Sequence, residues 1–65
     1  MTRYIVKKVS NKLVVEKRNS KGMEVICKTA LPSHVESVIA AEAARMTRLG
    51  LKFQVENRTN IHMDV

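Results

Sequence analysis

Three stretches in the first half of the chain are rich in β-branched residues and alternate between apolar and polar positions, which predicts β-strands. They span residues 3–9, 12–18 and 23–28. Ser10-Asn11 separates the first two and predicts a two-residue turn, because Asn tolerates left-handed backbone angles. The segment 19–22 predicts a second turn, in which glycine supplies a positive φ.

The first turn sets the register of the predicted hairpin. With Ser10-Asn11 at its tip, Val6 lies opposite Val15 and Lys8 lies opposite Leu13. Because side chains alternate between the two faces of a strand, the face that carries Tyr4, Val6, Leu13 and Val15 is predicted to be buried.

The sequence predicts which residues of the third stretch share a face, but it does not define the register of this strand against the second one. Met23, Val25 and Cys27 recur at every second position, so we expect them to share one face. A four-residue loop and a five-residue loop before this strand would place opposite faces inward, and both registers stay open.

A helix is predicted to follow, from about residue 34 to Leu49. Ser33 to Glu36 has the S-x-x-E form of a capping box, and Gly50 is a natural residue to end the helix. Apolar residues recur at three- and four-residue spacing, which predicts one buried face: Val35, Val38, Ile39, Met46 and Leu49. Arg45 and Arg48 fall in the last turns and complement the helix dipole.

A fourth strand is predicted after the helix, where apolar and polar residues alternate over 51–56. Residues 58–65 leave three interpretations open: a flexible tail, a short edge strand or an arm swapped in a dimer. The fold class is therefore α+β: a small antiparallel-type sheet in the order β-β-β-α-β, with one amphipathic helix packed on one face. Residues 1–65 are expected to form a single domain.

Positive charge is concentrated at the start of the chain. The net charge is +6, with residues 1–28 carrying eight basic and two acidic side chains and residues 29–65 carrying four of each. A surface with this bias attracts an anionic partner. At 45% hydrophobic and 28% charged residues, the composition is that of a folded protein rather than of a disordered tail.

The short chain limits how the fold is stabilised. A domain of this size buries only about 60% of its unfolded surface, and a homodimer is one way to add the missing stability. Cys27 is the single cysteine, so no disulfide forms within the chain, and this favours a reducing, cytoplasmic location. No secretory signal and no apolar run of membrane-spanning length is found.

Residues for catalysis are scarce. Cys27 could act as a nucleophile with His34 or His62 as base, but it alternates with apolar residues, which is typical of a small buried hydrophobe. The spacing of these three residues matches no metal site. Glu36 is assigned to the helix cap and Glu42 to a pair with Arg45 one turn later. We therefore expect no enzymatic activity, no metal or other cofactor, and no small-molecule substrate.

The basic side chains of the predicted hairpin are the candidate binding site for nucleic acid. They are Arg3, Lys7, Lys8, Lys12, Lys17, Arg18 and Lys21. Arg3, Lys7, Lys12 and Arg18 are expected on the face opposite the apolar one. The order of three strands before a helix resembles that of DNA-binding domains that read DNA with a sheet. Tyr4 and Phe53 are the only aromatic residues, so contact with the phosphate backbone is favoured over base stacking.

A protein partner is the alternative. Ile5, Val9 and Val14 are expected among the basic residues, and a mixed cationic and apolar patch suits docking on an acidic protein surface. In the order of its elements the chain resembles small phage host-takeover proteins. That resemblance implies an inhibitor or modulator of a host protein such as the transcription machinery. A third interpretation needs no partner, because lysines on a sheet face also protect its edges and its solubility.

Overall fold

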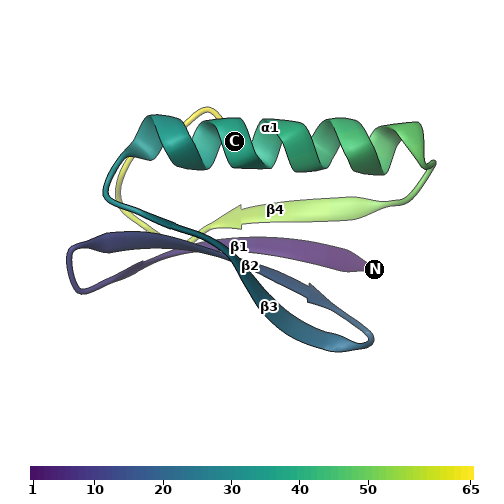
Figure 1. Ribbon diagram of the computed structural model, residues 1–65, viewed down its shortest axis with the longest axis horizontal. Coiled ribbons are helices and arrows are strands. Elements are labelled where there is room, and N and C mark those ends of the chain that lie inside the picture. The colour runs from purple at the N-terminus through teal and green to yellow at the C-terminus, as the bar shows by residue number, and fades with distance from the viewer.

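Four strands form one mixed sheet with a single helix on one of its faces, in a computed structural model that describes all residues 1–65 (Figure 1). The strands lie in the order β3-β2-β1-β4. The elements are β1 (Thr2–Val9), β2 (Lys12–Asn19), β3 (Gly22–Thr29), α1 (Pro32–Arg48) and β4 (Phe53–Asn57). The predicted α+β fold and the order β-β-β-α-β are confirmed.

The sheet departs from the predicted antiparallel type at β4, which pairs with β1 in parallel. The cause is the connection through α1. Two antiparallel pairings make β3 parallel to β1, and α1 carries the chain from the free edge of β3 to the free edge of β1. A crossover helix of this kind returns the chain in its original direction, so the strand that follows adds in parallel.

The first hairpin has the predicted register, with Val6 opposite Val15 and Lys8 opposite Leu13. The turn differs in one detail. Ser10, rather than Asn11, has the positive φ, at 55°. Ser10 is also the only residue besides glycine with a positive φ, so the turn holds an ordinary residue in a conformation that glycine adopts more readily.

A β-bulge in β3 corrects the prediction that Met23, Val25 and Cys27 share a face. Cys27 pairs with Val15, and Val25 pairs with the next residue of β2, so Ile26 is the extra residue between them. The bulge reverses the alternation: Val25 lies on the face opposite α1, whereas Cys27 packs half-buried against the core.

The core lies between the sheet and α1. Its buried members are Tyr4, Val6, Leu13, Val15, Val35, Ile39, Met46 and Met63. Val35, Ile39 and Met46 come from the predicted helix face, but Val38 is only half-buried and Leu49 is exposed. Leu49 is the C-cap residue, one position after the end of α1, and is not part of the core.

The two ends of α1 differ from each other in how well the sequence predicted them. The capping box at Ser33 is wrong, because the helix begins at Pro32 and its N-cap residue, Leu31, makes no side-chain cap hydrogen bond. Gly50 ends the helix as predicted, with a φ of 70°. Its N–H donates to the carbonyl of Thr47 and the N–H of Leu51 donates to that of Met46, the pattern of a Schellman motif. This helix is too short and too polar to cross a membrane.

Residues 58–65 form no strand and return to the core. Figure 1 shows this segment rising from the end of β4 and passing behind α1. Met63 is buried in the core, and the backbone N–H of Asp64 donates to Glu36 Oε2 at 2.9 Å. Asn57 holds the start of the segment by donating from Nδ2 to the carbonyl of Ile61. The segment therefore covers part of the same side of the sheet as α1.

Candidate functional site

The face of the sheet opposite α1, here called the outer face, is covered by no helix, strand or loop (Figure 1). Strand pairing assigns its residues, because paired residues point to the same side of a sheet. They are Arg3, Ile5, Lys7 and Val9 of β1, Lys12, Val14, Glu16 and Arg18 of β2, Met23, Val25 and Lys28 of β3, and Gln54 and Glu56 of β4. The face that packs against α1 is called the inner face.

Glu16 is the centre of one charge cluster on the outer face. Lys7 Nζ lies 2.8 Å from its Oε2, and Arg18 donates to its Oε1 from Nη2 at 2.7 Å and from Nε at 3.1 Å. Glu16 is only 7% exposed, which makes it the one buried charged residue of the chain. The hydrogen bonds from Lys7 and then from Arg18 hold the pKa of Glu16 below its ordinary value.

Glu56 is the centre of a second cluster on the far side of β1. Arg3 Nη2 donates to its Oε1 at 3.2 Å, and Arg58 Nε pairs with its Oε2. The hydrogen bond from Arg58 lowers the pKa of Glu56. Ile5 lies between the two carboxylates, since it pairs with Glu16 on one side and with Glu56 on the other.

Ion pairs therefore shield the apolar centre of the outer face. Ile5 is 0% exposed although no element packs above it, and Val14 is also buried. Of the three apolar residues predicted on this face, only Val9 stays exposed. Exposed apolar surface lies instead along β3, at Met23 and Val25. The sequence did not predict this position because it depends on the bulge.

The outer face has a large excess of positive charge. Including Arg58, it carries six cationic residues and two carboxylates. The other four acidic residues, Glu24, Glu36, Glu42 and Asp64, lie on the inner face of β3, on α1 and in the C-terminal segment. Lys12 and Lys28 are exposed and take part in none of the six ion pairs. These two ammonium groups are free to meet an anion.

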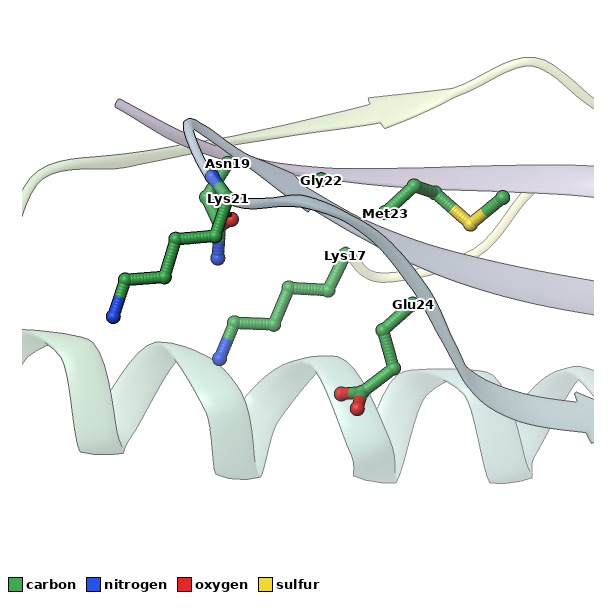
Figure 2. Close-up of a pocket in the computed structure, with 6 residues that line it drawn as sticks. All are labelled: Lys17, Asn19, Lys21, Gly22, Met23 and Glu24. Carbon is green, nitrogen blue, oxygen red and sulfur yellow. Dashed lines mark hydrogen bonds between the residues drawn. The ribbon is translucent and has the colours of Figure 1, made fainter.

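The structure divides the seven predicted basic residues between the two faces. Arg3, Lys7, Lys12 and Arg18 lie together on the outer face. Lys8 and Lys17 lie on the inner face, opposite Leu13 and Tyr4, and Lys17 Nζ is 3.7 Å from Glu42 Oε1. Figure 2 shows Lys17 and Lys21 pointing toward α1 beside an open cleft of about 220 Å³. Five of the six residues that line this cleft are not hydrophobic, and it is smaller than most clefts that bind small ligands.

Sequence reasoning left four charged residues out of the site: Glu16, Lys28, Glu56 and Arg58. Lys28 was missed because the bulge determines which way it points. Gln54, Glu56 and Arg58 alternate with the half-buried Phe53 and Val55, so their outward direction was readable from the sequence. The contact between Glu56 and Arg3 could not be predicted from the sequence, because it depends on the parallel pairing of β4 with β1.

The candidate catalytic residues do not form a cluster. No three His, Cys, Asp or Glu side chains lie close enough together to hold a metal ion. His34 is exposed, and its Nδ1 lies 3.2 Å from Thr29 Oγ1, while His62 is exposed in the C-terminal segment. Every buried side-chain nitrogen and oxygen has a hydrogen-bond partner, so no buried polar atom is left to bind a ligand.

Both aromatic residues lie on the inner face. Tyr4 and Phe53 pack edge to face, with ring centroids 6.1 Å apart, and Tyr4 is fully buried. The outer face therefore offers charge but no aromatic ring on which a base could stack. Comparisons of this chain with protein-family models, with curated proteins and with solved structures find no match.

Proposed function

We propose that this protein is a non-enzymatic binding module whose outer face contacts nucleic acid, mainly along its phosphate backbone. The observation that carries the proposal is an uncovered sheet face with six cationic residues and two carboxylates. Cationic side chains displace the counterions condensed on nucleic acid, and this release supplies most of the affinity of backbone contacts.

The ion pairs on the outer face support contact with phosphate rather than with base edges. Each carboxylate is already held by two cations, which compete with a base for its lone pairs. Lys12 and Lys28 are single lysines, which act as point charges and do not offer the planar bidentate geometry by which arginine reads guanine.

Binding of labelled nucleic acid at a series of salt concentrations tests the proposal. Each phosphate contact contributes about 0.7 to 0.9 to the slope of log K against log salt. The double variant Lys12→Gln/Lys28→Gln is expected to bind more weakly, with a slope shallower by about two. The matched control is Lys8→Gln/Arg48→Gln, which removes the same charge from exposed, unpaired residues of the inner face and of α1. Equal loss in both variants would show only a dependence on net charge.

A second candidate function is docking on an acidic protein surface. Met23 and Val25 favour it, because they are 56% and 51% exposed on the outer face, beside Arg18 and Glu16. An apolar patch bordered by cations suits a protein interface. A pull-down from lysate with and without nuclease separates the two functions. A protein that stays bound after nuclease treatment, and is lost with Met23→Ser/Val25→Ser, would favour this second function.

A further inference from the structure

We infer that the nucleic acid on the outer face is double-stranded DNA, with the two backbones that border its major groove lying over opposite edges of the sheet. This inference rests on the proposed function and specifies its substrate class. Three features of the outer face carry it: the separation of its cations into two groups, the absence of aromatic rings, and the absence of a groove.

The cations of the outer face form two ion-paired groups, which meet where Arg3 pairs with Arg18 and lie apart at Lys28 and Arg58. Arg3 and Arg58 gather around Glu56 on the β4 side. Lys7 and Arg18 gather around Glu16 on the β2 side, where Lys12 and Lys28 add two unpaired charges. Each carboxylate holds two cations, so each cluster keeps a net positive charge.

The distance between the outermost residue of each group is close to the width of a duplex groove. Lys28 pairs with Val14, which pairs with Lys7, and Arg58 follows the residue that pairs with Val6. Lys28 and Arg58 are therefore level with each other on opposite edges of the sheet. Three strand spacings of about 4.8 Å place their Cα atoms about 14 Å apart. The major groove of B-form DNA is about 12 Å wide, so one backbone can lie along each edge.

A single strand needs features that the outer face lacks. Single-stranded DNA and RNA are held in a cationic groove with aromatic side chains on which successive bases stack. The only two aromatic rings face α1. The two clefts lie at the turn between β2 and β3 and at the end of the sheet. Met23 is the one residue assigned to the outer face that lines either cleft, and none of the six cations of that face does. A-form RNA duplexes fit less well, because their major groove is narrow and deep.

The test measures fluorescence anisotropy of three labelled probes of one sequence: a DNA duplex of about 20 base pairs, which is two helical turns, its single strand, and the RNA duplex. We expect the DNA duplex to bind at least about tenfold more tightly than either other probe, a difference of about 1.4 kcal/mol. Comparable or tighter binding of the single strand or the RNA duplex would overturn the inference and leave the proposed function standing. Failure of all three probes to bind would overturn both.

Two single variants test whether both edges take part. Lys28→Gln and Arg58→Gln remove one exposed charge from opposite edges, and Glu56 retains Arg3 in the second variant. Each is expected to weaken duplex binding and to lower the salt slope by about one. Arg48→Gln, which removes an exposed charge from α1, is the control and is expected to change neither. An effect at one edge alone would contradict binding of two backbones, provided that circular dichroism shows native folding in both variants.

Discussion

The hydroxyl of Tyr4 donates a 2.8 Å hydrogen bond to Glu42 Oε1 and so joins the first strand to the helix. The same oxygen accepts from Arg45 Nη2 at 3.0 Å and lies 3.7 Å from Lys17 Nζ. Burial raises the pKa of Glu42, but the hydrogen bonds from Tyr4 and Arg45 outweigh it, so the net shift is downward. The pKa of Tyr4 is raised, first by burial and then by its bond to the carboxylate. The carboxylate thus adds a polar link between the sheet and α1 to the packing of the core.

Replacing Tyr4 with Phe should destabilise the fold while leaving the packing intact. The variant loses a hydrogen bond to a charged group, which is worth about 1.5–3 kcal/mol, and solvent at the partly exposed Glu42 places the expected loss near the lower end. Urea denaturation measures it as a lower midpoint. Glu42→Gln is the companion variant, because its amide oxygen still accepts from Tyr4 but no longer attracts Arg45. A Tyr4→Phe midpoint equal to that of the parent would show that the hydrogen bond adds nothing.

Acid should destabilise the fold through three carboxylates. The pKa values of Glu16, Glu42 and Glu56 are all lowered in the folded state from an ordinary value of 4.5. A lowered folded-state pKa adds stability that is fully present above the ordinary value and is lost as the pH falls through the folded-state value. We therefore expect urea midpoints to be constant from about pH 7 to pH 5 and to fall below about pH 4.5. Glu16→Gln should flatten part of this fall, and a pH-independent midpoint would contradict the ion-pair assignment.

Local sequence signals predicted local structure well. The hairpin register followed from alternating apolar residues on both sides of a two-residue turn, and the end of α1 followed from Gly50. The capping box failed because its pattern requires only Ser and Glu at the right spacing. In the structure Pro32 starts the helix two residues before the predicted position, and Glu36 accepts from Asp64 instead.

Features that depend on distant pairing could not be predicted from local patterns. The bulge at Ile26 decides which residues of β3 face outward, yet nothing in the alternation of 23–28 marks it. The cluster around Glu56 joins Arg3 to a residue 53 positions later, through a parallel pairing that only the complete fold creates. The concentration of basic residues in the first half of the chain therefore indicated the region of the candidate site. Which of these residues lie on the outer face and which on the inner face could be seen only in the three-dimensional structure.

Ser10→Gly should stabilise the protein. Ser10 has a φ of 55°, which strains a residue with a side chain but not glycine. Relief of this strain outweighs the added flexibility of the unfolded chain, and the expected gain is about 0.5–1 kcal/mol. Asn11→Gly is the matched control, since Asn11 has no positive φ and gains only unfolded-state flexibility. Thermal unfolding should show a higher Tm than that of the parent for Ser10→Gly and no increase for Asn11→Gly. Equal shifts would place the strain elsewhere in the turn.

Met63→Ala should show that the C-terminal segment belongs to the core. Met63 is 6% exposed, and truncation of a buried methionine costs about 2–5 kcal/mol. We expect about 2 kcal/mol here, because a cavity near the end of a chain can partly close. Val65→Ala is the control, as Val65 is 41% exposed two residues further on. The two urea midpoints should therefore differ clearly. A Met63→Ala midpoint close to that of Val65→Ala would mean that residues 58–65 detach in solution.

Charge reversal at Lys12 and at Lys8 should separate the two faces of the hairpin. Both lysines are exposed at the same end of β1 and β2, but Lys12 lies on the outer face and Lys8 on the inner face. Lys7 is a poorer choice, because a glutamate there would stand against Glu16 and disturb the fold. Neither Lys12 nor Lys8 has an ion-pair partner, so both variants should fold with stability within about 0.5 kcal/mol of the parent.

Only Lys12→Glu is expected to weaken nucleic-acid binding strongly, by about tenfold or more at low salt, since it places a negative charge against the phosphates. Lys8→Glu changes the net charge by the same amount but acts from the far side of the sheet. Its effect should be small and should vanish as salt shortens the range of electrostatic attraction to about 8 Å. If the two variants lost affinity equally at physiological salt, binding would follow net charge, and the outer face would not be the interface.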